Sequence, residues 1–96
     1  MIYLKNKDNK IAVALKYDKE NIAPKVIAKG KGEIAEKIIQ EAEKNNINTV
    51  ENKDLVEDLI NLEIGQVIPE RLYMAVAEIL AFVYELDKKK GENFEK

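Results

Sequence analysis

A glycine-flanked lysine is the first group of residues whose type and spacing could support chemistry. Gly30-Lys31-Gly32 lies between an apolar stretch and a helical pattern, where backbone N–H groups and a helix N-terminus can hold a phosphate. The segment lacks the first glycine and the Lys-Ser/Thr ending of a P-loop, and it lacks the spacing of a dinucleotide fingerprint. A structural turn is the favoured interpretation, and a small phosphate-ligand-binding domain is kept as an alternative.

Clusters of like charge are the other candidates. The pairs Glu33/Glu36 and Glu51/Asp54 could serve acid–base or metal chemistry, but each pair is also typical of a solvated helix face or cap. The lysine run 88–90 could attract an anion, but glutamates follow it, and so short a run is typical of a solubilising tail. We predict no catalytic residue, no metal site and no cofactor, and therefore no enzyme.

The composition removes several classes of site. The 96 residues include neither histidine nor cysteine, which excludes disulfides, thiolate or imidazole metal sites, and Ser–His or Cys–His nucleophiles. Net charge is −2 with Lys and Glu mixed along the chain, so the basic face of a nucleic-acid binder is missing. No apolar run reaches the roughly 18 residues of a membrane span, and the charged start differs from a signal peptide. A cytoplasmic protein without a membrane span of its own is expected.

Hydrophobic periodicity predicts the elements that must carry any site. The alternation over Ile11 to Tyr17 predicts a strand with Ile11, Val13, Leu15 and Tyr17 on one face and two alanines on the other. Short strands are also expected at residues 2–4, 25–29 and 49–51. Helical spacing predicts three helices, from Glu33 to about Asn45 with Ile34 facing inward, from Lys53 to about Asn61 after an Asn52 cap, and from Ile68-Pro69 onward.

Four blocks of sequence carry a resemblance to a known family. They are residues 11–18, 23–30, 63–70 and 72–84. In order and spacing they resemble the cytoplasmic domain of the FlhB/YscU family, the export-switch proteins of flagellar and injectisome type III secretion. The resemblance implies an α/β (α+β) fold, a small mixed four-stranded sheet wrapped by about three helices. We expect one FlhB C-terminal-like domain over residues 1–87 and a charged flexible tail over 88–96.

The same resemblance points to a self-cleavage turn. Members of the family cut themselves at an Asn-Pro-Thr-His turn, where the asparagine side-chain amide attacks its own carbonyl carbon, forms a succinimide and breaks the bond to proline. The matching positions here hold Lys7, Asp8, Asn9 and Lys10. Lysine has no amide to cyclise, so we predict that the chain does not cut itself. The rival hypothesis is a self-cleaving protein that uses Asn6 or Asn9 in a shifted register.

A recognition surface is the positive implication. An apolar patch of the family is thought to receive a short hydrophobic signal of exported subunits, and it corresponds to Ala23, Pro24, Ala77 and Leu80. The helical spacing of Ala77, Leu80 and Tyr84 independently places them on a face of their own. Full-length members carry four transmembrane helices ahead of this domain. The start at Met1 therefore predicts a stand-alone, non-cleaving member that binds export-apparatus components and exported subunits at the periphery of the flagellar export gate.

Overall fold

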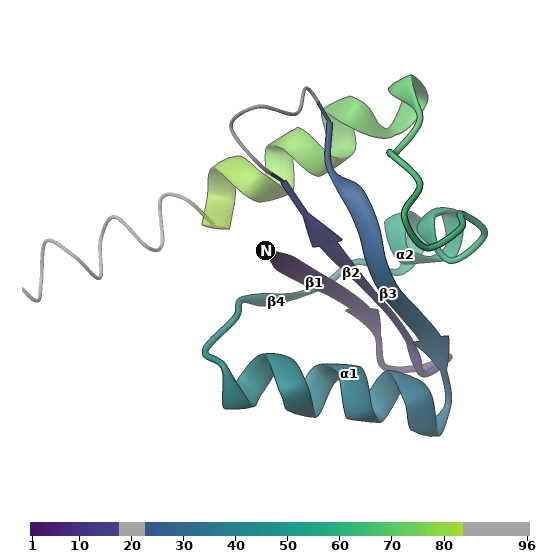
Figure 1. The fold of residues 1–96 in the computed structure, drawn as a ribbon, viewed down its shortest axis with the longest axis vertical. Coiled ribbons are helices and arrows are strands. Elements are labelled where there is room, and N and C mark those ends of the chain that lie inside the picture. The colour runs from purple at the N-terminus through teal and green to yellow at the C-terminus, as the bar shows by residue number, and fades with distance from the viewer. Residues whose placement is uncertain (18–22, 84–96) are drawn as a thin grey trace, which may run out of the picture.

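A mixed sheet forms the centre of the molecule. The structure is a computed structural model that describes residues 1–17 and 23–83. In this part of the chain, four strands lie in the order β3-β2-β1-β4 (Figure 1). They are β1 (Ile2–Asn6), β2 (Ile11–Lys16), β3 (Lys25–Lys31) and β4 (Thr49–Glu51). β2 pairs antiparallel with both β1 and β3, whereas β4 pairs parallel with β1 at the opposite edge from β3.

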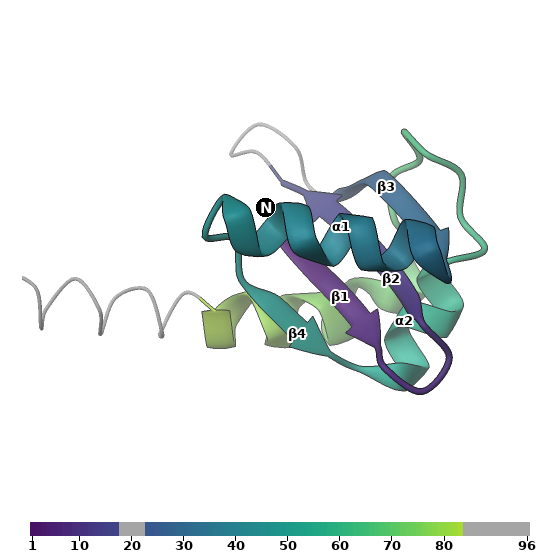
Figure 2. The same ribbon diagram turned by 90° about the horizontal axis from the view of Figure 1, so that it is seen from below.

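Helices cover the two faces of this sheet. Helix α1 (Glu33–Lys44) lies on one face. Helix α2 (Lys53–Leu59) lies on the other face together with residues 73–83, which are helical and follow the 3-10 turn η1 (Glu70–Leu72). Figure 2 shows α1 in front of the strands with these other helices behind them. The predicted α+β class, with its mixed sheet and its helices, is confirmed.

Strand β2 is buried on both faces because it carries large apolar residues on one side and alanines on the other. Val13 and Leu15 belong to the main hydrophobic cluster, which also contains Leu4. Ala12 and Ala14 are fully buried on the α1 side, where their small side chains allow the helix to approach closely. The predicted alternation is confirmed up to Leu15. It fails at Tyr17, which lies beyond the end of the strand and is 46% exposed.

Local signals explain where the helices begin. The Asn52 side chain accepts a hydrogen bond from the Leu55 N–H at 3.0 Å, which is the predicted N-cap of α2. Helix α1 follows Gly32, whose φ of 61° suits a residue without a side chain, and it ends at Lys44 as predicted. Helix α2 is shorter than predicted, because it ends at Leu59 rather than near residue 61.

The prediction for the start of α1 was wrong in two respects. Strand β3 continues to Lys31 instead of ending at residue 29, and its Gly30 pairs with Ala12 of β2. Ile34 is 59% exposed instead of facing inward, and the fully buried residues of α1 are Ala35 and Ala42. Ile34 packs directly over Gly30 of β3, which is an edge strand of the sheet. Because no described strand lies beyond β3, the outer side of the Ile34 side chain stays exposed.

The segment before the last helix is tied to the start of β3. The Val26 N–H donates to the Gln66 carbonyl at 3.0 Å, and the Ile68 N–H donates to the Pro24 carbonyl at 3.0 Å. Pro69 then precedes the single 3-10 turn of η1, so the α-helix begins a few residues later than predicted. The predicted domain end at residue 87 and the predicted tail lie outside the described residues.

We predict that Gly30→Ala destabilises the fold by about 1–3 kcal/mol, the usual range for overpacking a well-packed site. A methyl group at position 30 would lie 2.8 Å from the Ile34 Cβ and would also meet its Cγ2. Urea unfolding followed by circular dichroism measures the loss. The control is Ile34→Ala, which removes Cγ2 from an exposed side chain and should restore part of the stability when combined with Gly30→Ala. Additive effects of the two substitutions would contradict this packing account.

Candidate functional site

The turn between β1 and β2 is the first candidate, because the family resemblance places cleavage there. It comprises residues 7–10, and the flanking Asn6 and Ile11 face each other across the sheet. Asn6 is the last residue of β1, which is longer than the predicted strand at residues 2–4, and it is 3% exposed. Its Oδ1 accepts a hydrogen bond from the Asp8 N–H at 3.1 Å, an arrangement that starts the turn. Its Nδ2 is buried and has no partner among the described residues.

Polar contacts hold this turn against three other elements. The Lys7 N–H donates to Glu51 Oε1 of β4 at 3.4 Å, and Asn9 Nδ2 donates to Glu57 Oε1 of α2 at 3.1 Å. Lys10 Nζ lies 3.2 Å from Glu36 Oε1 of α1. All the turn residues are exposed. Lys7, the position that the resemblance predicts for a reacting asparagine, carries an amine, and the amide nitrogen of Asn9 is hydrogen-bonded to Glu57.

The glycine segment before α1 does not form a phosphate cradle. Gly30 and Lys31 belong to β3, and the Gly32 N–H donates to the Lys10 carbonyl at 2.8 Å. The first turn of α1 carries Glu33 and Glu36, whose negative charges repel an anion from this helix end. These carboxylates complement the helix dipole, which is their structural role. Within residues 1–17 and 23–83, no group of three or more acidic side chains is placed to hold a metal ion.

The second candidate is the apolar patch predicted at Ala23, Pro24, Ala77 and Leu80. Ala23 is 5% exposed and belongs to the main hydrophobic cluster, and Leu80 is half-buried against that same cluster. Pro24 is buried and its carbonyl is bonded to Ile68, whereas Ala77 is exposed on the helix. Ala23 and Leu80 thus share one cluster, and Ala77 offers an open surface. Tyr84, the other residue predicted on this face, lies outside the described residues.

Sequence reasoning missed the most exposed apolar side chains of this helix. Met74 is 73% exposed, Phe82 is 60% exposed and Tyr73 is 37% exposed. The buried residues of the helix are Val76 and Val83, which are seven positions apart and define its inner face. Counting 100° per residue from Val76 places Met74 on the opposite side. This helical angle can be calculated from the sequence alone, and it would have predicted that Met74 is exposed.

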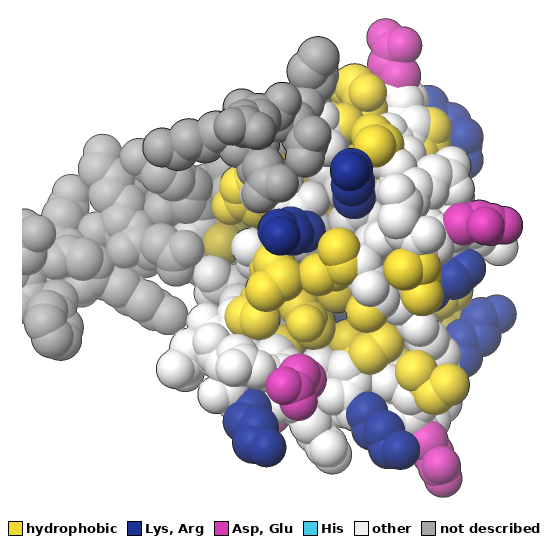
Figure 3. All heavy atoms as spheres, viewed as in Figure 1, with side chains coloured by type: hydrophobic (Ala, Val, Ile, Leu, Met, Phe, Trp, Pro, Cys, Tyr) yellow, Lys and Arg dark blue, Asp and Glu magenta, His cyan; other side chains and the backbone are white. Residues whose placement is uncertain are grey.

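Another apolar surface lies over β3, on the face seen in Figures 1 and 3. Figure 3 shows hydrophobic side chains gathered near the centre of this face, with charged side chains around them. Ile27 and Ala28 of β3 and Ile38 of α1 are partly buried members of the second hydrophobic cluster. Helix α1 therefore covers its side of the sheet incompletely. None of the helices in the described ranges is long and apolar enough to cross a bilayer.

Comparison with protein families and with relatives agrees with this fold. A model of the FlhB HrpN YscU SpaS family matches residues 8–83. The Bacillus subtilis protein YlqH is 49% identical over 78 residues, which cover 80% of this chain and 84% of YlqH. The flagellar biosynthetic protein FlhB of Buchnera aphidicola is 53% identical over 83 residues, which cover 84% of this chain. The chain spans 22% of the length of that FlhB.

A solved structure shows the same architecture. The cytoplasmic domain of FlhB from Shewanella putrefaciens superimposes with a TM-score of 0.86 at 36% identity. The match covers 95% of this chain and 70% of that domain. The chain therefore has the fold of that cytoplasmic domain over nearly all of its length.

We predict that Lys10→Asn makes the turn more stable than Lys10→Gln does, by about 0.5–1 kcal/mol. Lys10 has a φ of 48°, a left-handed conformation that asparagine adopts more easily than other side chains. Both substitutions remove the exposed ion pair with Glu36, so the glutamine variant is the matched control. Thermal and urea unfolding of the two variants measures the difference. Equal stabilities would show that the backbone at residue 10 is not strained.

Proposed function

The chain belongs to the FlhB HrpN YscU SpaS family, and from this premise we propose that it is a non-cleaving interaction module of flagellar type III protein export. The observation that carries the proposal is the pairing of a retained scaffold with a changed turn. The fold matches the FlhB cytoplasmic domain, while Lys7, Asp8, Asn9 and Lys10 replace the residues of the cleavage reaction. The module would work by binding rather than by catalysis.

The proposed partners are exported subunits and components of the export gate. The apolar surface of residues 73–83 supports this proposal, because Ala77 is exposed and Leu80 is only half-buried. Met74, which is about 60° around the helix from Ala77, enlarges the surface that a short apolar segment would cover. An exposed apolar helix face of this kind suits a partner helix or an extended peptide. The protein would act in the cytoplasm, at the periphery of the gate.

Absence of self-cleavage is the second half of the proposal. Cyclisation needs a side-chain amide nitrogen that attacks its own carbonyl carbon, while the peptide nitrogen that leaves takes up a proton. Lys7 lacks that amide, and Asp8 replaces the proline. Neither Asn6 nor Asn9 precedes a proline, and the Asn9 Nδ2 already donates to Glu57 Oε1. A switch protein that stays uncut would keep a single connected state.

We predict that the purified chain is one species near its full mass of 11.0 kDa, measured by intact mass spectrometry after days at neutral pH. The four substitutions Lys7→Asn, Asp8→Pro, Asn9→Thr and Lys10→His should introduce cleavage after position 7, because the scaffold is already that of the family. The control carries Lys7→Ala with the same three other changes and should stay intact. Fragments from the natural chain would establish the rival, self-cleaving hypothesis.

We further predict that Ala77→Asp weakens binding of a short apolar peptide from an exported flagellar subunit at least tenfold, because it places a charge in the docking surface. Ala75→Asp is the matched control, since Ala75 is also exposed but lies about 160° around the helix from Ala77. Titration followed by ¹⁵N NMR measures both affinities and locates the surface. Unshifted signals at Ala23, Ala77 and Leu80 at saturation would overturn this docking surface.

A further inference from the structure

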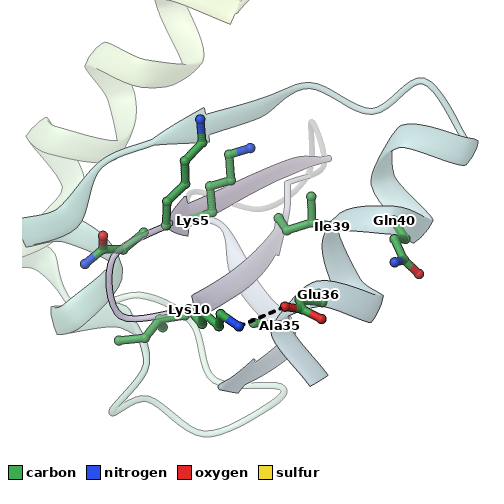
Figure 4. Close-up of a pocket in the computed structure, with 9 residues that line it drawn as sticks. Lys5, Lys10, Ala35, Glu36, Ile39 and Gln40 are labelled. Carbon is green, nitrogen blue, oxygen red and sulfur yellow. Dashed lines mark ion pairs between the residues drawn. The ribbon is translucent and has the colours of Figure 1, made fainter. Parts of the chain in front are cut away.

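A pocket between the end of the β1–β2 hairpin and α1 has a composition that neither the cleavage turn nor the apolar patch explains. Its volume is about 310 Å³, and it opens to solvent. Lysines 5, 7 and 10 line it from the hairpin, and Ala35, Glu36 and Ile39 line it from α1. Figure 4 shows Ile39 pointing from the helix toward the strands, while Lys5 and Lys10 extend from the hairpin.

The charge of this pocket is opposite to that of the chain. Three lysines and one glutamate give the lining a formal charge of +2, because 3 − 1 = 2, whereas the whole chain carries −2. Among the described residues, Lys10 has an ion pair with Glu36, and no ion pair of Lys5 or Lys7 occurs. The Lys10–Glu36 pair is itself weak, since both side chains are more than half exposed. An incoming carboxylate can therefore replace Glu36 at little expense.

The uncharged part of the lining consists of the apolar Ile11, Ala35 and Ile39 and of two amides, Asn6 and Gln40. Ala35 is buried and Ile39 is half-buried, so the floor of the pocket is hydrocarbon while its rim is cationic. A free phosphate would leave that floor exposed, and no glycine-rich loop points N–H groups into the pocket, since the Gly32 N–H is bonded to Lys10. The lining instead matches a segment that carries an aliphatic side chain between carboxylates. The volume accommodates one or two such side chains, at the lower end of the range for ligand sites.

We propose that this pocket binds an acidic segment of a partner protein, with an aliphatic side chain over Ile39 and carboxylates paired with Lys5, Lys7 and Lys10. The site lies on the α1 side of the sheet, whereas the docking surface of residues 73–83 lies on the other side (Figure 2). The two surfaces can therefore bind different partners at once. Lys7 and Lys10 occupy two of the positions that the resemblance assigns to the cleavage motif. In this proposal these positions bind a partner instead of taking part in a cleavage reaction.

The test uses the full chain and two synthetic peptides, acetyl-Asp-Glu-Leu-Glu-Asp-amide and its neutral counterpart acetyl-Asn-Gln-Leu-Gln-Asn-amide. Titration followed by ¹⁵N NMR should show saturable shifts at residues 5–10 and 35–40 with the acidic peptide, and at least tenfold weaker binding of the neutral one. Each of Lys7→Gln and Lys10→Gln should weaken binding about 2- to 5-fold, and the double variant about tenfold. The affinity should fall as salt rises.

Matched controls separate this site from general charge attraction. Lys37→Gln and Lys44→Gln remove two exposed lysines of α1 that do not line the pocket, and they should leave the affinity unchanged. Equal weakening by the two pairs of variants would overturn the site. Inorganic phosphate that saturates the same signals as tightly as the acidic peptide would overturn the peptide assignment, and so would binding to phosphatidylglycerol vesicles without binding to the peptide. Binding of the apolar peptide to the Ala77 surface should persist in Lys7→Gln/Lys10→Gln, which keeps the two proposals independent.

Discussion

Burial of β2 and β1 on both faces is the constraint on which the rest of the structure depends. Val13 and Leu15 need a thick layer on their side, which α2 and residues 73–83 supply. Ala12 and Ala14 need only a thin one, which α1 supplies at close range. The sheet is thus packed between two unequal layers, because a strand with large residues on one face and small ones on the other can be covered in no other way.

Features of the fold that depend on local signals could be predicted from the sequence, whereas features that depend on strand order could not. The β2 alternation, the Asn52 cap and the helical spacing after Glu33 are local signals, and they placed β2, the start of α2 and the extent of α1 correctly. The exposure of Ile34 and the extension of β3 through Gly30 were missed because both depend on which strand is at the edge. Strand order results from long-range pairing of β4 with β1, and no short stretch of sequence encodes it.

The candidate sites also differ in how much of each could be predicted from the sequence. The turn could be proposed as a site from the resemblance alone, which predicts that its four positions correspond to a cleavage motif. Its contacts with Glu51, Glu57 and Glu36 could not, because these residues are far apart in the sequence and meet only through the sheet. The cationic pocket was missed for a further reason. Lys5 belongs to a strand and Ile39 to a helix, and neither looks unusual until the hairpin and α1 lie side by side.

The parallel pairing of β4 with β1 has a consequence for the order of folding. Strands β1, β2 and β3 are neighbours both along the chain and in the sheet, so they can assemble from local contacts. Strand β4 is three residues long and must close a loop of more than forty residues to reach β1, with register Tyr3 to Thr49. We therefore expect the free edge of β1 to stay open in folding until the segment through α1 brings β4 to it. An incompletely folded chain would expose that edge to strands of other molecules and could aggregate through it. Helix α1 therefore helps to prevent aggregation as well as connecting β3 to β4.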